Sequence, residues 1–143
     1  MITVTHKRVS LDQVGKFHLD DAIVQARLTD VKEKAGLDEM MYLSTCNRVE
    51  FFVVCESEID NDWLVNFYGE FKPEWTPDEV EDAVLVSEIY EGRNVVEHLF
   101  NVASSIDSMV IGEREIITQV RTAFEQSKKM GLTGAIILLL LRK

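Results

Sequence analysis

The sequence is poor in cysteine and in long apolar runs, and each shortage excludes a class of protein. Its two cysteines, Cys46 and Cys55, are nine residues apart and follow no secretory leader. They offer neither a disulfide framework nor zinc-ligand spacing, so we expect a metal-free protein in a reducing, cytoplasmic compartment. The longest apolar run, at residues 135–141, is far shorter than the roughly 20 residues of a membrane span. It predicts a helix that is cut short, and no membrane association.

Basic residues are also scarce, because 15 of them stand against 25 acidic residues and leave a net charge of −10. This balance argues against a protein that holds nucleic acid mainly through phosphate contacts. A polyanion would approach the C-terminal quarter, which is the least acidic part and contains Lys128, Lys129, Arg142 and Lys143. We favour the simpler interpretation that these residues complement the dipole at a helix C-terminus.

The 143 residues suit one domain, which at this length buries about two thirds of its unfolded surface. Alternating and β-rich stretches predict four strands, over residues 2–6, 40–45, 48–55 and 83–90. Capping residues and apolar spacing predict a short helix after Ser10, one from Asp20 or Asp21 to Gly36, and one over residues 61–71. This order predicts an α+β fold, a ferredoxin-like split βαβ antiparallel sheet with helices on one face. Additional C-terminal helices are predicted after Gly92.

A cysteine stands where two predicted strands meet. Packing alone would place Gly, Asp or Asn in such a turn, so Cys46 suggests a nucleophile. A nearby cation favours the reactive thiolate, and if the chain stays extended, the guanidinium of Arg48 lies beside the sulfur. Thr45 and Asn47 add hydrogen-bond donors for a substrate. A small buried hydrophobe is the alternative; local sequence alone favours it for Cys46, and more strongly for Cys55.

Other candidate residues lie on the predicted C-terminal helices. His98 borders the apolar stripe of the helix that follows Gly92, where a lone histidine is most often structural. Glu113 and Glu115 open the next helix, where carboxylates complement the dipole. Gln119, one turn after Glu115, lines the same face. A functional role for these residues needs a reason from outside their local pattern.

A resemblance supplies that reason. Ser44–Glu50 closely resembles the signature of the glutamyl-tRNA reductases, and His98–Glu113 is similar to the second long motif of that family. Thr5–Lys7 stands where the family has an Asn-His-Lys-like segment, so the resemblance covers the chain. It implies that Cys46 and His98 are catalytic. It also implies a set of substrate-binding residues: Thr45, Asn47, Arg48, Ser108, Glu113, Arg114, Glu115 and Gln119.

The family uses NADPH to reduce glutamyl-tRNA to glutamate-1-semialdehyde, the first step of tetrapyrrole (5-aminolevulinate, porphyrin) biosynthesis. The resemblance implies that Cys46 captures the glutamyl group as a thioester and that His98 orients the substrate or handles a proton. It further implies that the full-length protein is a homodimer. The product would be handed over to the glutamate-1-semialdehyde aminotransferase.

Residues 1–143 are expected to be the N-terminal catalytic domain alone, because the family continues into an NADPH-binding Rossmann domain and a dimerisation domain. The chain has no glycine-rich strand-to-helix fingerprint, so we predict no NADPH-binding residue in it. Ser105 stands where the family often has Gly, and Arg114 where Pro or Gln is common. These departures concern the loop geometry and the role of Arg114, not the nucleophile.

Two other functions fit the residues without the resemblance. One is a cysteine-dependent ester or thioester hydrolase, in which water accepts the acyl group from Cys46. This function needs a base aligned with the thiol. The other is a non-catalytic ferredoxin-like interaction module in which Cys46 is structural, and a thiol hidden from reagents would favour it.

Overall fold

The computed structural model describes the backbone of residues 1–103 and 113–141 and the side chains of residues 1–98 and 119–138. Its four strands are β1 (Ile2–Thr5), β2 (Glu39–Ser44), β3 (Arg48–Val54) and β4 (Glu88–Ile89). They form one sheet in the order β2-β3-β1-β4, with every neighbouring pair antiparallel. This is the strand order of a split βαβ sheet, so the predicted fold class is confirmed.

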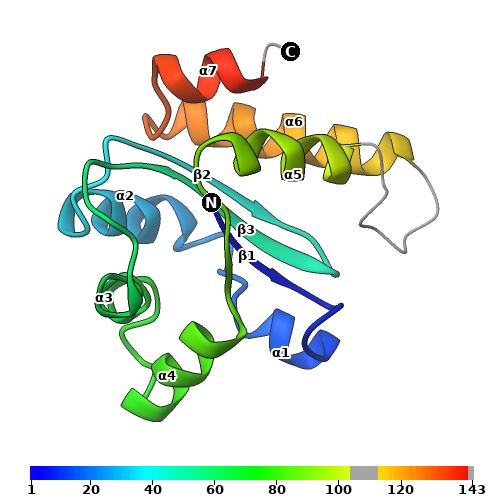
Figure 1. Ribbon diagram of the computed structural model, residues 1–143. Coiled ribbons are helices and arrows are strands. Elements are labelled where there is room, and N and C mark those ends of the chain that lie inside the picture. Colours follow the sequence, from blue (N-terminus) through cyan, green and yellow to red (C-terminus); the bar gives the residue numbers. More distant parts are fainter. Residues whose placement is uncertain (104–112, 142–143) are drawn as a thin grey trace.

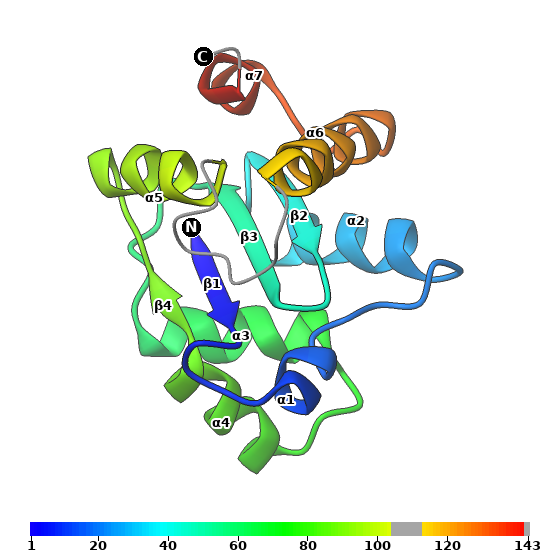
Figure 2. The same cartoon turned by 90° about the vertical axis from the view of Figure 1, so that its right-hand side faces the viewer.

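Seven helices are described along the chain. They are α1 (Leu11–Gly15), α2 (Val24–Lys34), α3 (Asn61–Phe71), α4 (Pro77–Val86), α5 (Arg93–Ala103), α6 (Glu113–Lys129) and α7 (Ala135–Leu141). Helices α1 to α4 lie on one side of the sheet, and α5, α6 and α7 lie on the other (Figures 1 and 2). The additional C-terminal helices therefore give the sheet a second helical layer. No helix in the described part of the chain has the length and apolar character needed to cross a membrane.

The main core lies between the sheet and α1 to α4. Ile2, Val4 and Phe51 point into it from alternate strand positions and have no exposed surface. Phe51 meets the rings of Phe67 and Phe71 edge-on, with centroids 5.0 and 4.9 Å away. Burying one such side chain contributes about 1.5–3 kcal/mol. The helical spacing of the apolar residues in α3 thus fixes that helix against the sheet, over the residues that the sequence predicted.

One predicted strand was wrong for most of its length. Residues 83–90 were expected to be extended, but α4 continues to Val86 and the strand is only Glu88–Ile89. Thr76 and Glu79 form a capping box with Pro77 in the first turn, so the helix has a strong start. Its buried residues, Val80 and Ala83, are three apart, which is helical spacing. A short run of apolar residues after them suits either structure.

Glu39 holds α7 over the other face of the sheet. Its carboxylate accepts hydrogen bonds from the backbone N–H groups of Gly134, Ile136 and Ile137 at 2.7, 3.1 and 2.9 Å. These are N–H groups that a helix start leaves without partners, and a negative charge is favourable there. A strand residue thus supplies the cap of a helix almost a hundred residues later, which no local pattern in the sequence indicates.

Candidate active site

The turn between β2 and β3 carries the predicted nucleophile at its tip. Cys46 is exposed, and the chain bends at Cys46 and Asn47. Thr45 stabilises the bend because its Oγ1 accepts the backbone N–H groups of Asn47 and Arg48, each at 3.2 Å. The Thr45 N–H also donates to the Arg48 carbonyl at 2.9 Å. A threonine hydroxyl therefore organises this turn in place of glycine.

Two histidines from outside the hairpin hold the same turn. Nε2 of His18 donates to the carbonyl oxygen of Thr45 at 2.9 Å. The backbone N–H of His6 donates to the Asn47 carbonyl at 2.9 Å, and the His6 ring Nδ1 lies 3.3 Å from that oxygen. The carbonyls on either side of Cys46 are thus fixed from two directions. Sequence reasoning missed His18, which belongs to none of the recognised motifs.

The expected position of Arg48 beside the sulfur depended on an extended chain, and the bend removes that premise. The Arg48 side chain is 2% exposed, and its Nη1 lies 3.1 Å from Oε1 of the fully buried Glu50. The strand alternation that buries Val49 and Phe51 in the main core turns Arg48 and Glu50 to the opposite face. A buried carboxylate is therefore an immediate ionic partner of the guanidinium.

Glu50 joins Arg48 to the second predicted catalytic residue. Its Oε1 also accepts hydrogen bonds from His98 Nε2 at 2.7 Å and from Thr3 Oγ1 at 3.3 Å. The His98 ring is 4% exposed and stacks on Tyr90, with centroids 4.1 Å apart. Glu50 is thus the centre of a buried polar cluster, and the sequence analysis missed its role. The sequence did contain a signal for this role, because two charged residues lie on one face of a predicted core strand.

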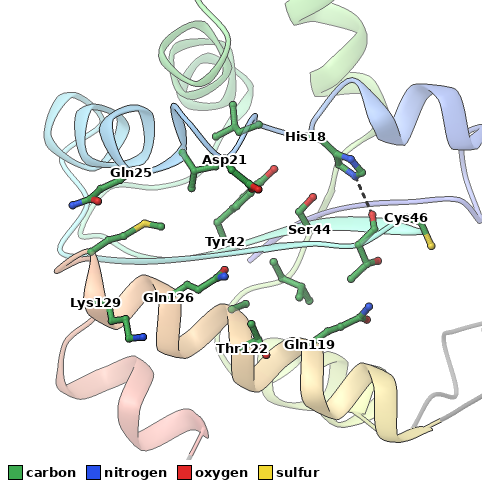
Figure 3. A pocket seen from close by; sticks show the side chains of 16 residues that line it. His18, Asp21, Gln25, Tyr42, Ser44, Cys46, Gln119, Thr122, Gln126 and Lys129 are labelled. Atoms are coloured by element: carbon green, nitrogen blue, oxygen red, sulfur yellow. Dashed lines mark hydrogen bonds between the residues drawn. The ribbon is translucent and has the colours of Figure 1, made fainter.

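A groove begins at Cys46 and runs between β2, the start of α2 and α6 (Figure 3). Its volume is about 810 Å³. Of the predicted site residues, Thr45, Cys46 and Gln119 line it. The ring of Tyr42 forms part of the floor, its hydroxyl donates to the Phe17 carbonyl at 2.8 Å, and burial raises its pKa to about 12. Tyr42 is therefore a neutral, fixed phenol near pH 7.

The second cysteine is in a different environment. Cys55 follows β3, is partly buried and packs against the main core, as predicted. Its Sγ lies 3.5 Å from the Ser57 carbonyl, and burial raises the pKa of the Cys55 thiol. Of the two thiols, Cys46 is thus the more exposed. No group of three or more metal-ligating His, Cys, Asp or Glu side chains occurs among the described residues.

Several predicted substrate residues cannot be placed by their side chains. Ser108 lies outside the described residues, as does Ser105. Glu113, Arg114 and Glu115 form the first turn of α6, but their side chains are also outside the described set. The described residues thus bring Thr45, Cys46 and Gln119 to one groove. They bring Arg48 and His98 to one buried carboxylate.

Along almost its whole length, the chain is similar to proteins of known identity. Residues 2–143 match the family described as glutamyl-tRNAGlu reductase, N-terminal domain. Proteins named glutamyl-tRNA reductase are 38% identical over 143 residues in Desulfotalea psychrophila and 32% identical over 138 residues in Archaeoglobus fulgidus. These alignments cover 98% and 95% of this chain but 32% and 28% of the relatives, so the chain spans about a third of their length.

A solved structure agrees with these alignments. The glutamyl-tRNA reductase from Methanopyrus kandleri superposes with a TM-score of 0.74 at 25% sequence identity. The match covers 99% of this chain and 31% of that one. Sequence and fold thus point to the same N-terminal region.

Proposed function

The chain belongs to the glutamyl-tRNA reductase family, whose N-terminal domain it matches over residues 2–143, and from this premise we propose that it performs the acyl-transfer half of glutamyl-tRNA reduction. In this proposal residues 1–143 are the catalytic domain. The observation that carries it is the exposed Cys46 thiol, held at the tip of a turn whose flanking carbonyls are fixed by His18 and His6. A nucleophile on a pre-organised turn loses little freedom when it attacks.

The proposed reaction begins with attack of the Cys46 thiolate on the ester carbonyl that joins glutamate to the 3′ end of the tRNA. A C–S bond forms and the ester C–O bond breaks, and its electron pair goes to the ribose oxygen, which takes a proton. The product is a glutamyl thioester on Cys46. A thioester accepts a hydride far more readily than a carboxylate, and the covalent bond keeps the acyl group in place.

We assign the recognition of the glutamyl group to the residues around the turn and the start of α6. Glutamate presents an α-amino group and a γ-carboxylate, so an arginine and an acidic residue are complementary to it. Glu50 holds the Arg48 guanidinium in place, and Glu113 is the proposed acidic partner. The remaining proposed contacts come from Thr45, Asn47, Ser108, Arg114, Glu115 and Gln119. His98, held by Glu50, would orient the substrate or handle a proton.

The reduction itself needs a second component. In the proposed reaction NADPH would supply a hydride to the thioester, so that glutamate-1-semialdehyde leaves and the Cys46 thiolate is restored. The chain has no glycine-rich turn from a strand into a helix, so its residues do not fit that cofactor. We therefore propose that NADPH binds outside these 143 residues, and that tetrapyrrole synthesis, a homodimer and product transfer to the aminotransferase belong to the whole protein.

A comparison of two cysteine variants tests the proposed nucleophile. In the intact protein, Cys46→Ser should abolish NADPH-dependent aldehyde formation from glutamyl-tRNA. Cys55→Ser should keep most of that activity, because Cys55 packs at the edge of the core. Circular dichroism checks that both variants fold. An equal loss of activity in two folded variants would show that Cys46 alone is not the nucleophile.

A further inference from the structure

The groove that begins at Cys46 continues well past it along α6. Four polar side chains line it at spacings of three, four and three residues, which places them on one face of the helix: Gln119, Thr122, Gln126 and Lys129. They follow one another along α6 opposite β2, and Lys129 lies at the end away from Cys46 (Figure 3). All four are exposed, and this polar stripe faces the groove. The basic residue that ends it is one of those that the sequence suggested for contact with a polyanion.

The groove is longer than a glutamyl group requires. Gln119 and Lys129 are ten residues apart, which is about 15 Å of helix at 1.5 Å per residue. A glutamyl group has five carbons in a row, and four bonds of about 1.5 Å span at most about 6 Å. A ligand that fills the groove must therefore extend beyond the acyl group, on the side of the ester that leaves.

The lining suits a nucleotide better than a second acidic group. Among the lining residues that the structure describes, Lys129 supplies an ammonium and Asp21 a carboxylate. Amides, which both donate and accept hydrogen bonds, come from Gln25, Gln119 and Gln126. Glutamine amides read the edge of adenine, carboxylates accept from ribose hydroxyls, and lysine contacts phosphate. A glutamyl γ-carboxylate would gain nothing from Asp21, and the acidic partner proposed for the α-amino group is Glu113.

We propose that this groove binds the 3′-terminal nucleotide of the tRNA, the alcohol half of the ester that Cys46 cleaves, with Lys129 contacting a backbone phosphate. The proposal rests on the proposed function and adds a subsite to it. It also explains how a chain with a net charge of −10 receives an RNA end, since the phosphate contact is local and the remaining recognition is by neutral polar groups.

Two acyl donors with the same glutamyl group separate the two halves of the ester. One is adenosine 5′-monophosphate glutamylated on its 3′ hydroxyl, and the other is the α-ethyl ester of glutamate. Acylation of Cys46 in the intact protein is followed by intact-mass spectrometry at increasing donor concentration. The variant is Lys129→Gln. The matched control is Lys128→Gln, which changes the adjacent lysine of the same helix, exposed but not part of the groove lining.

We expect Lys129→Gln to raise the half-saturating concentration of the nucleotide ester about two- to fivefold, the range for one exposed ion pair. The value for the ethyl ester should change by less than about 1.5-fold, and Lys128→Gln should change neither. With glutamyl-tRNA, the slope of log affinity against log salt should become shallower by about 0.7 in Lys129→Gln. An equal effect on both donors would overturn the proposal, because the groove would then bind the acyl side. An equal effect of both lysine variants, or no effect of either, would also overturn it.

A separate titration measures binding in the groove independently of the acylation of Cys46. The unacylated trinucleotide CCA, the common 3′ end of tRNA, is titrated into each protein by calorimetry, and Lys129→Gln should bind it two- to fivefold more weakly than Lys128→Gln. If neither donor acylates Cys46 in the unmodified protein, the proposed function fails while this titration still decides the groove. Equal binding of CCA by the two variants would overturn the subsite even if acylation proceeds.

Discussion

The most direct test of the buried polar cluster around Glu50 is the substitution Glu50→Gln. Oε1 of Glu50 accepts hydrogen bonds from Arg48, His98 and Thr3, and the carboxylate has no exposed surface. At 3.1 Å and an effective dielectric constant of about 20, the attraction to the guanidinium is about 5 kcal/mol before desolvation is counted. Breaking a buried ion pair by removing one charge typically costs about 3–5 kcal/mol, because the other charge stays buried. Glutamine keeps one acceptor oxygen, so we expect a loss of about 3 kcal/mol.

The assay is urea unfolding of the 143-residue chain by circular dichroism, with the slope checked for a change in the exposed surface. The control is Glu56→Gln, the same change at an exposed position, for which we expect less than about 0.5 kcal/mol. The double variant Arg48→Met, Glu50→Gln should lose less than the sum of the single losses, because no unpaired charge remains. A loss below about 1 kcal/mol for Glu50→Gln, or additive losses in the double variant, would refute the reasoning.

Three further predictions concern the chemistry. Arg48→Lys keeps the charge but loses the planar fork of the guanidinium, and Glu113→Gln removes the proposed acidic partner. Each variant should lower kcat/KM for glutamyl-tRNA at least about tenfold. Wild-type values of kcat/KM in both variants would refute the proposal that these residues recognise the charges of the glutamyl group. Iodoacetamide should label Cys46 faster than Cys55 near pH 8, because burial raises the pKa of the Cys55 thiol and leaves less thiolate at that pH, and peptide mass spectrometry measures the order. The 143-residue chain, mixed with glutamyl-tRNA, should release tRNA or accumulate a glutamyl adduct on Cys46, and NADPH should change nothing. Aldehyde formed by the chain with NADPH, or tight NADPH binding by calorimetry, would place the cofactor site within it.

The central hairpin was predictable because strands alternate with a period of two and helices have a period near 3.6. The order of these elements along the chain then indicated the strand order of a split βαβ sheet. The α3 helix was predicted with the bounds observed, since Asp60 caps its first turn and its apolar residues recur at helical spacing. The end of α4 was not predictable, because four or five apolar residues suit a strand or a helix equally. There the capping box at Thr76 decides the structure from several residues away.

In the candidate site, too, the features set by local sequence were predictable and those set by distant contacts were not. The turn could be recognised from Thr45 to Arg48, because a thiol between two strands departs from ordinary turn chemistry. Its supports could not, since His18 and Glu50 act on partners 27 and 48 residues away in the sequence. Alternation does predict that residues 48 and 50 share a face, but it does not say that a histidine from a later helix joins them.

The two faces of the sheet differ in their buried polar side chains, although both carry apolar clusters, and this difference is itself an argument for function. Facing α1 to α4, the buried strand side chains are apolar. Among the described residues, the buried polar and charged side chains all belong to the other layer: Thr3, Thr5, Glu39, Arg48, Glu50, His98 and Ser127. Glu39 stabilises α7, but a buried ion pair can often be replaced by apolar residues of similar volume without loss of stability, so stability alone does not explain Arg48 and Glu50. Local rules are typically broken at functional sites. Since Arg48 directly follows the Cys46 turn, the polar layer reaches the proposed nucleophile, where an acidic substrate would need a buried cation.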